Sequence, residues 1–192
     1  SHDLRNPLRV VEGSIELYHE TGDENHYERS LDGIERMRRL IDDLLVLARY
    51  GDSVVDPEPV DLSDVAADAW GMVASSRAEL TGHDELTLEA DPGQLCRLLE
   101  NLFENAIEHG GPAVSVTVGT TRSGFYIADD GPGISDEKQD DVFEAGYSTA
   151  ENGTGYGLRI VERVAEAHGW DVRVTDSAEG GARVGGAGVG SA

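Results

Sequence analysis

The sequence predicts a helical hairpin followed by an α+β domain, in which helices cover a mixed sheet. The hairpin is indicated by two successive stretches whose apolar residues recur at spacings of three and four, with a Thr-Gly-Asp break at residues 21–23 between them. The α+β class is indicated by helical and strand patterns that alternate irregularly along the remainder of the chain. We therefore expect a hairpin at residues 1–52, a linker at 53–60 and a domain at 61–192.

Each helix of the predicted hairpin carries one apolar stripe. The stripe of the first helix is Leu4, Leu8, Val11, Ile15 and Tyr18, and that of the second is Ile34, Met37, Ile41, Leu44 and Ala48. Two stripes alone bury too little apolar surface to hold a hairpin together, so it packs either on the rest of its own chain or against a second copy. We favour the second alternative, a homodimer whose two hairpins form a four-helix bundle.

The stretch between hairpin and domain has a glycine at residue 51 and prolines at 57 and 59, which is typical of a linker. The domain then begins with a helix from residue 61 to about residue 77 and a short strand at residues 86–90. Asp91 and Pro92 open a second helix, because proline fits the first helical turn. Its buried face is predicted to consist of Leu95, Leu98, Leu99, Leu102 and Ala106.

The last part of the predicted domain is richer in strands. Strands are expected at residues 113–118 and 125–128, followed by a polar, lid-like loop at 135–152. A helix from about residue 154 to residue 168 and a strand at 172–175 complete the domain. The glycine-rich tail from residue 185 is predicted to be frayed.

The chain is strongly acidic, with 15 basic against 38 acidic residues among 192 and a formal net charge of −23. Such a surface repels nucleic acid and anionic membranes, so we expect neither as a partner. Lys138 is the only lysine, and an acid excess with almost no lysine suggests adaptation to concentrated salt, where self-repulsion is screened. The alternative is an ordinary acidic protein.

The sequence shows no run of 18 apolar residues and no signal peptide, so we expect a soluble, cytoplasmic piece without membrane contact. The single cysteine, Cys96, excludes a disulfide within the chain and fits a reducing interior.

Two asparagines and a carboxylate form the first candidate site. Asn101 and Asn105 stand at i and i+4, on one face of the predicted helix. Their carboxamide oxygens can ligate a hard cation such as Mg²⁺, although an asparagine pair by itself is more often surface filler. Asp129 follows a predicted strand and precedes Gly131 and Gly133, which let the backbone approach a ligand closely.

A second glycine cluster, Gly-Thr-Gly-Tyr-Gly-Leu at residues 153–158, precedes a predicted helix whose amino end favours phosphate. Its spacing differs from the dinucleotide fingerprint, and no Gly-Lys-Ser/Thr of a Walker phosphate loop occurs in the sequence. The asparagine pair, the Asp-x-Gly-x-Gly stretch and this cluster, in that order, are far more specific than any one of them.

In this order the motifs resemble those of the transmitter core of sensor histidine kinases, whose nucleotide domain is similar to those of gyrase, certain heat-shock chaperones and mismatch-repair ATPases. Residues 101–105 resemble the N box, 129–133 the DxGxG box, 142–144 the F box and 153–158 the second glycine box. Ser-His-Asp-Leu-Arg-Asn-Pro-Leu at residues 1–8 resembles the phosphoacceptor H box. The resemblance extends to about residue 184 and, with the composition, suggests a haloarchaeal histidine kinase.

The resemblance implies an ATP-dependent kinase that phosphorylates its own His2 and passes the phosphoryl group to an aspartate in the receiver domain of a response regulator. His2 would be the nucleophile and Asp3 the general base that accepts its proton. Asn6 lies four residues from His2 and, in the family, orients a water that dephosphorylates the regulator, so a phosphatase activity is also implied.

The resemblance also assigns the nucleotide contacts, with ATP and Mg²⁺ as the expected ligands. Asp129 would accept the adenine amino group, Asn105 would ligate Mg²⁺ and Asn101 would assist at the phosphates. The remaining expected nucleotide-binding residues are Gly131, Gly133, Gly153, Gly155, Gly157 and Leu158.

Two departures from the family pattern motivate a second hypothesis. Glu108 stands where many relatives have a lysine or arginine, and residues 145–149 of the lid lack the arginine that often follows the F box. Lys138 is the one lysine that could substitute. The second hypothesis is a catalytically weak docking and dimerisation module that binds nucleotide. An ATPase clamp like the gyrase relatives is disfavoured by the H-box hairpin.

Overall fold

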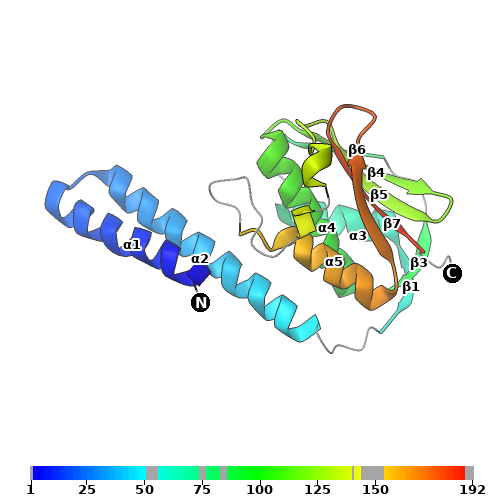
Figure 1. Ribbon diagram of the computed structural model, residues 1–192, viewed down its shortest axis with the longest axis horizontal. Helices are drawn as coiled ribbons and strands as arrows, with labels where there is room; N and C mark the ends of the chain where they lie inside the picture. Colours follow the sequence, from blue (N-terminus) through cyan, green and yellow to red (C-terminus); the bar gives the residue numbers. More distant parts are fainter. Residues whose placement is uncertain are drawn as a thin grey trace.

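The computed structural model describes residues 2–50, 56–73, 77–82, 86–139, 141–143 and 154–188. A long helical hairpin projects from a domain of helices and strands (Figure 1). The hairpin consists of α1 (His2–Thr21) and α2 (Glu24–Tyr50), which lie side by side. Between them, Gly22 adopts a φ of +67°, and its N–H donates to the carbonyl of Tyr18 at 2.8 Å. The predicted helices and the break at residues 21–23 are confirmed.

Few side chains are buried between the two helices. Val11 and Leu40 are the buried apolar residues among those described in the hairpin. Most of the large residues of the two predicted stripes are instead exposed, namely Leu8, Ile15, Ile34, Ile41 and Leu44. The hairpin therefore presents an apolar surface that its own chain leaves uncovered over the described residues.

The domain is built on a five-stranded sheet with the order β2-β4-β5-β7-β6. These strands are β2 (Glu79–Thr81), β4 (Ser115–Thr121), β5 (Gly124–Asp129), β6 (Asp171–Asp176) and β7 (Ala182–Ala187). The β2–β4 pair is parallel and the others are antiparallel, so the sheet is mixed, as predicted. A second, two-stranded sheet pairs β1 (Glu58–Asp61) with β3 (Thr87–Ala90) antiparallel.

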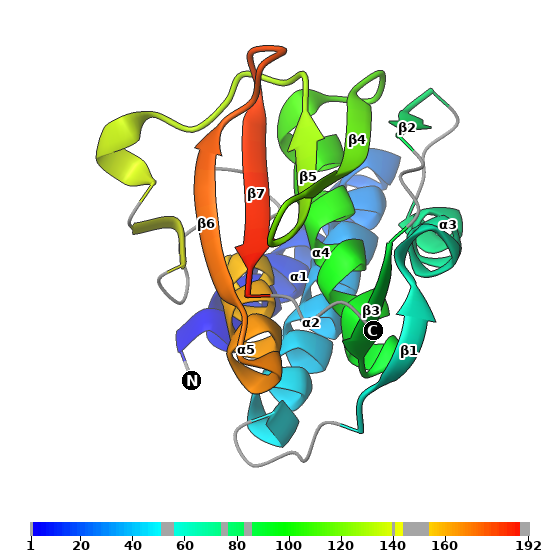
Figure 2. The same ribbon diagram turned by 90° about the vertical axis from the view of Figure 1, so that its right-hand side faces the viewer.

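Three helices, α3 (Leu62–Val73), α4 (Pro92–Gly110) and α5 (Gly157–His168), complete the domain. Figure 2 shows α4 and α5 behind the strands β4 to β7, with the hairpin farther back. The core lies between this layer and the sheet, and it extends to α3, whose Trp70 ring contacts Phe103 of α4 edge-on with centroids 5.2 Å apart. Val46 and Leu47 near the end of α2 also pack on this core. The α+β class is confirmed.

Strand β7 corrects the prediction of a frayed tail from residue 185. Gly185 and Gly186 pair with β6, and Gly185 also lies opposite Tyr126 of β5. The prediction was wrong because a strand between two neighbours is held by its backbone hydrogen bonds, which glycine also makes. The Arg183 guanidinium of the same strand stacks over the Tyr126 ring at 3.8 Å.

Strands β1 and β2 are not predicted by the sequence. Glu58, Pro59 and Val60 lie in the expected linker, yet they pair with β3. An edge strand tolerates Pro59, which has no N–H to donate. In the expected lid loop, the described residues include two single-turn helices, η1 (Asp136–Lys138) and η2 (Asp141–Phe143). Of the predicted lid, residues 140 and 144–152 lie outside the description.

No helix among the described residues is both long and apolar enough to cross a membrane.

Candidate functional site

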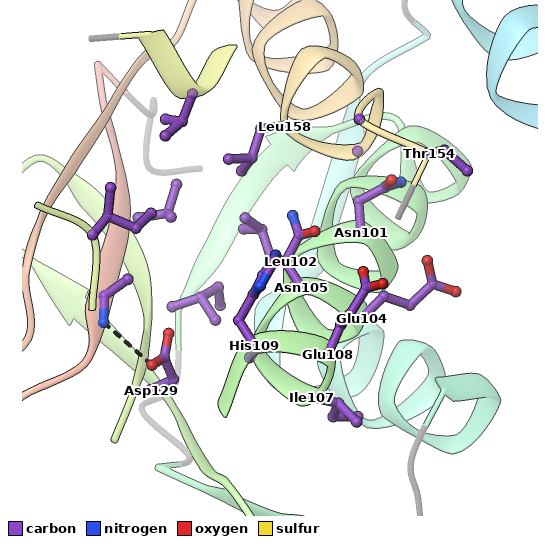
Figure 3. A pocket seen from close by; sticks show the side chains of 18 of the residues that line it. Asn101, Leu102, Glu104, Asn105, Ile107, Glu108, His109, Asp129, Thr154 and Leu158 are labelled. Atoms are coloured by element: carbon purple, nitrogen blue, oxygen red, sulfur yellow. Dashed lines mark hydrogen bonds between the residues drawn. The ribbon is translucent and has the colours of Figure 1, made fainter. Parts of the chain in front are cut away.

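A cavity of about 860 Å³ lies between the sheet, α4, α5 and the hairpin. Asn101, Asn105 and Asp129 line it, together with Gly133, Gly155, Gly157 and Leu158. Figure 3 shows Asp129 on the strand side, facing Asn105 and His109 of α4, with Thr154 and Leu158 near the start of α5. Residues predicted from three separate stretches of the sequence thus meet around one cavity.

Helix α4 positions the two asparagines. Its start is fixed by Asp91, whose Oδ1 accepts hydrogen bonds from the N–H groups of Gly93 (3.0 Å) and Gln94 (3.1 Å). The four leucines of the predicted apolar face and Ala106 are all buried, and this burial fixes the rotation of the helix about its axis. Asn101 is buried, and its Nδ2 donates to the Arg97 carbonyl at 2.8 Å. Its Oδ1 therefore faces the start of α5.

Asn105 Nδ2 is buried and has no hydrogen-bond partner among the described residues. A buried amide without a partner costs free energy, so this group is suited to a ligand in the cavity. Rotation of the carboxamide exchanges its nitrogen and oxygen, and the oxygen is a ligand type that Mg²⁺ accepts. No cluster of three His, Cys, Asp or Glu side chains able to hold a metal occurs in the described part of the chain.

Asp129 stands at the end of β5 with one oxygen engaged by the backbone. Its Oδ1 accepts from the N–H of Gly131 at 2.9 Å and from the N–H of Ala182 at 3.2 Å, the bond drawn in Figure 3. These two bonds fix the carboxylate and leave Oδ2 for a donor in the cavity. The neighbouring Asp130 is turned away and accepts from the Ser115 N–H at 2.9 Å.

Two glycines lie where the backbone approaches its neighbours closely. A Cβ at Gly131 would lie 2.9 Å from both Asp129 Oδ1 and the Cα of Gly110. A Cβ at Gly157 would lie 3.2 Å from Asn101 Oδ1 and 3.5 Å from Asn105. The first turn of α5 therefore rests against both asparagines, and the positive end of the helix dipole lies at the cavity. Gly153 lies outside the described residues.

The predicted phosphoacceptor residues lie in α1. The structure describes the backbone of His2 and Asp3 but not their side chains, and it leaves Asn6 exposed. Tyr18 of α1 contacts Tyr27 of α2, and Val11 of α1 lies against Gly33 of α2. The two helices are therefore antiparallel, and a residue nearer the start of α1 lies opposite a residue correspondingly farther along α2. Continued to the start of α1, this register places the His2 backbone beside residues 42–43 of α2, which line the cavity.

Charged residues join α2 to the domain beside the cavity. Asp43 of α2 accepts a hydrogen bond from the Thr154 hydroxyl at 2.7 Å, and Arg97 Nη2 lies 3.7 Å from its other oxygen. Burial raises the pKa of the Asp43 carboxyl, against the lowering effects of Thr154 and Arg97. Burial opposes the charge of Arg97, but a hydrogen bond to Glu100 and nearby carboxylates outweigh it and raise the pKa of Arg97.

Asp43, Thr154, Arg97 and Ala182 are not predicted as site residues by the sequence. Thr154 lies inside the predicted glycine cluster, but its partner Asp43 is 111 residues away, so no local pattern links them. Ala182 acts through its backbone, which has no sequence signal. The sequence held no signal for Asp43, because the predicted stripe of this helix runs through Ile41 and Leu44, whereas Asp43 lies on the face of the buried Leu40.

Comparison with known proteins finds two family models. Residues 1–53 match the His Kinase A (phospho-acceptor) domain, and residues 90–185, half of the chain, match the histidine kinase-, DNA gyrase B- and HSP90-like ATPase. The probable sensor histidine kinase TcrY of Mycobacterium tuberculosis is 33% identical over 203 residues, which cover 92% of this chain. The chain belongs to the sensor histidine kinase family.

Solved structures agree with this histidine kinase core. The Acinetobacter baumannii histidine kinase AdeS, 19% identical, matches the fold with a TM-score of 0.71 over 97% of this chain and 98% of its own. Full-length ShkA, solved in complex with AMPPNP, is 27% identical, with a TM-score of 0.68 over 88% of this chain and 39% of its own. The chain spans about two fifths of the length of TcrY, since the match covers 42% of that protein.

Proposed function

We propose that this chain is the catalytic core of an ATP-dependent protein-histidine kinase. It phosphorylates its own His2 and passes the phosphoryl group to an aspartate in a response-regulator receiver domain. The observation that carries the proposal is the hairpin register, which brings the His2 backbone to the level of the α2 residues that line the cavity. The start of α1, where the proposed nucleophile belongs, thereby lies at the level of the candidate nucleotide site.

Within the cavity, Oδ2 of Asp129 accepts the adenine amino group, and the two backbone N–H bonds to Oδ1 hold the carboxylate in place. The phosphates lie toward the first turn of α5, where the helix dipole and the close approach at Gly157 favour them. Asn101 contacts the phosphates beside Gly155, and Leu158 packs on the nucleotide. Gly131 and Gly133 shape the backbone that surrounds it, and Gly153, which lies outside the described residues, stays a predicted nucleotide-binding residue.

Asn105 holds Mg²⁺ through its carboxamide, and the buried amide without a protein partner supports this assignment. When bound, Mg²⁺ supplies charge neutralisation at the phosphates, on which phosphoryl transfer largely depends. Asp3 accepts the proton that His2 loses on attack, and Asn6 orients water in the reverse reaction on the phosphorylated regulator. The exposure of Asn6 is compatible with that contact.

The working unit is a homodimer. The large apolar residues left exposed on α1 and α2 support a four-helix bundle, because a second hairpin would cover them. We also propose a cytoplasmic location, because ATP is available there and Cys96 stays reduced. A further proposal is adaptation to high salt, which the net charge of −23 supports. The domain division of 1–52, 53–60 and 61–192 stays a prediction.

A second candidate is a docking module that binds nucleotide but transfers phosphate weakly. It is favoured by the acidic cavity wall, where Glu104 and Glu108 stand on α4. Incubation of the chain with γ-labelled ATP and Mg²⁺ separates the two. The kinase acquires a label that acid removes and alkali preserves, as a phosphorus–nitrogen bond requires. Nucleotide binding without such a label would favour the docking module.

A further inference from the structure

Among the described residues, Asp43 is the one acidic side chain that is buried, with 7% of its surface exposed. Burial of a carboxylate is unfavourable unless hydrogen bonds and opposite charge compensate for it. Here Thr154 donates to one oxygen at 2.7 Å and Arg97 lies 3.7 Å from the other. The neighbouring Asp42 is exposed. The position of Asp43 is therefore specific, and its partners belong to the domain rather than to the hairpin.

Both partners stand next to residues of the cavity. The Thr154 oxygen accepts the Tyr156 N–H at 3.3 Å, which holds the turn that carries Gly155 into α5. Arg97 is braced by Glu100 at 3.0 Å, and its carbonyl accepts the Asn101 side chain. Asp43 thus connects α2 both to the turn that precedes α5 and to α4, the helix that carries Asn101 and Asn105.

We propose that Asp43 is a positioning residue, which docks the phosphoacceptor hairpin on the phosphate-binding turn through Thr154. This inference rests on the proposed kinase function and extends it to a residue that the motifs do not include. The hairpin register places the His2 backbone beside residues 42–43, so the contact fixes the height of α1 relative to the first turn of α5. Misplacement of reacting groups by about 1 Å can reduce a rate about a hundredfold.

An inhibitory contact would have the opposite consequence. It would hold the hairpin where the phosphoacceptor is remote from the cavity, and its loss would raise the rate. The observed docking instead brings the start of α1 to the level of the cavity, so loss of the contact lowers the rate of transfer. Because Asp43 does not need to touch the nucleotide, the affinity for ATP changes little.

The test compares Thr154→Val, which removes the hydroxyl at nearly constant volume, with Thr154→Ser, which keeps it. Autophosphorylation rates of the full chain are measured against ATP concentration, and nucleotide affinity is measured separately by calorimetry. A hydrogen bond to a charged group corresponds to a factor of at least about 10 in rate. We expect Thr154→Val and Asp43→Ala to lower the rate at saturating ATP at least about tenfold, with KM within about twofold of the wild type. Thr154→Ser retains most of the rate.

Two further variants sharpen the test. The Asp43→Ala and Thr154→Val double variant should be no slower than the slower single variant, since each change alone removes the hydrogen bond between Thr154 and Asp43. Glu35→Gln removes one negative charge from an exposed site two turns earlier in α2 and should leave the rate unchanged. Unchanged or raised rates in Thr154→Val, additive losses, or a loss confined to nucleotide affinity would overturn the positioning role.

The outcome also separates this inference from the function on which it rests. A wild-type chain that binds nucleotide but acquires no acid-labile label contradicts the kinase function and the positioning role together. A labelled wild-type chain whose Thr154→Val variant is equally fast contradicts the positioning role alone. Retained nucleotide affinity in each variant shows that the domain is folded.

Discussion

The hairpin and the domain differ in how far each buries its own apolar side chains. Ten of the eleven large apolar side chains that are exposed in the described structure belong to α1 and α2, and the remaining one is Met72. The main core cluster, by contrast, gathers its buried members from the domain, and the hairpin adds only partly buried Val46 and Leu47. The domain completes its core within one chain, whereas the hairpin needs another surface.

This difference matches the two tasks in the proposed kinase. A nucleotide site needs a rigid frame, and here each wall of the cavity in the domain is an element packed on the core. A phosphoacceptor has to meet both a nucleotide and a regulator, so it stands on an element that projects from the domain (Figure 1). The two regions should therefore respond differently to mutation, and four experiments test that expectation.

The largest effect is expected in the domain core. Phe103 is fully buried against Trp70, and replacing a buried phenylalanine by alanine costs about 3–5 kcal/mol. Phe103→Ala should lower the free energy of unfolding by that amount in urea titrations and weaken nucleotide binding with it. Met72→Ala, at a side chain that is 71% exposed, should change it by less than about 0.5 kcal/mol. Equal effects of both changes would contradict the self-contained core.

The next effect concerns the exposed face of the hairpin. Leu44→Asp should raise the dissociation constant of the dimer at least about thirtyfold, because burial of a leucine contributes roughly 2 kcal/mol. Sedimentation across a range of protein concentrations measures this shift. Met72→Asp places the same charge on the domain and should leave dimerisation unchanged. A Leu44→Asp chain that dimerises like the wild type would show that the face is not the interface.

A third change should affect the nucleotide alone. Asp129→Asn should weaken binding of ATP at least about tenfold, since a charged hydrogen-bond acceptor contributes roughly 1.5–3 kcal/mol. The asparagine oxygen can still accept from Gly131 and Ala182, so fold and dimerisation persist. Asp130→Asn makes the same change at the neighbouring carboxylate, which faces Ser115 and should not affect affinity. If calorimetry gave Asp129→Asn the ATP affinity of the wild type, the assignment of Asp129 as the adenine-binding residue would be wrong.

The smallest expected difference is between salt concentrations. The charge of −23 on each chain is doubled in a dimer, and repulsion between exposed charges extends about 10 Å at 0.1 M salt but about 3 Å at 1 M. The unfolding midpoint should therefore rise with salt, and dimerisation should strengthen over the same range. A midpoint that stays constant between 0.1 M and 1 M would contradict salt adaptation.

The sequence predicted the elements that have strong local signals. Periodic apolar residues located the hairpin and α4, and Asp91 with Pro92 marked the start of α4. Strand β7 was missed because pairing of a glycine-rich strand depends on its neighbours, and β1 was missed because Pro59 is typical of linkers. Tertiary contact decided both cases.

The candidate site shows the same division between residues that local patterns predict and residues whose role depends on tertiary contacts. The resemblance predicts Asn101, Asn105 and Asp129 as nucleotide-binding residues, and the fold brings them to one cavity. The resemblance does not include Asp43, because the role of this side chain depends on its contacts with Thr154 and Arg97, which lie on distant parts of the chain. Docking between two regions depends on their relative placement, which no motif within either region records.

The central claim is that nucleotide held by the domain phosphorylates His2 on the hairpin. The most direct measurement is the amount of acid-labile label that the His2→Ala chain acquires from γ-labelled ATP, with nucleotide affinity measured on the same sample. Our account predicts no such label and an affinity equal to that of the wild type, because alanine removes the nucleophile and leaves the cavity intact. Undiminished labelling of His2→Ala would contradict it.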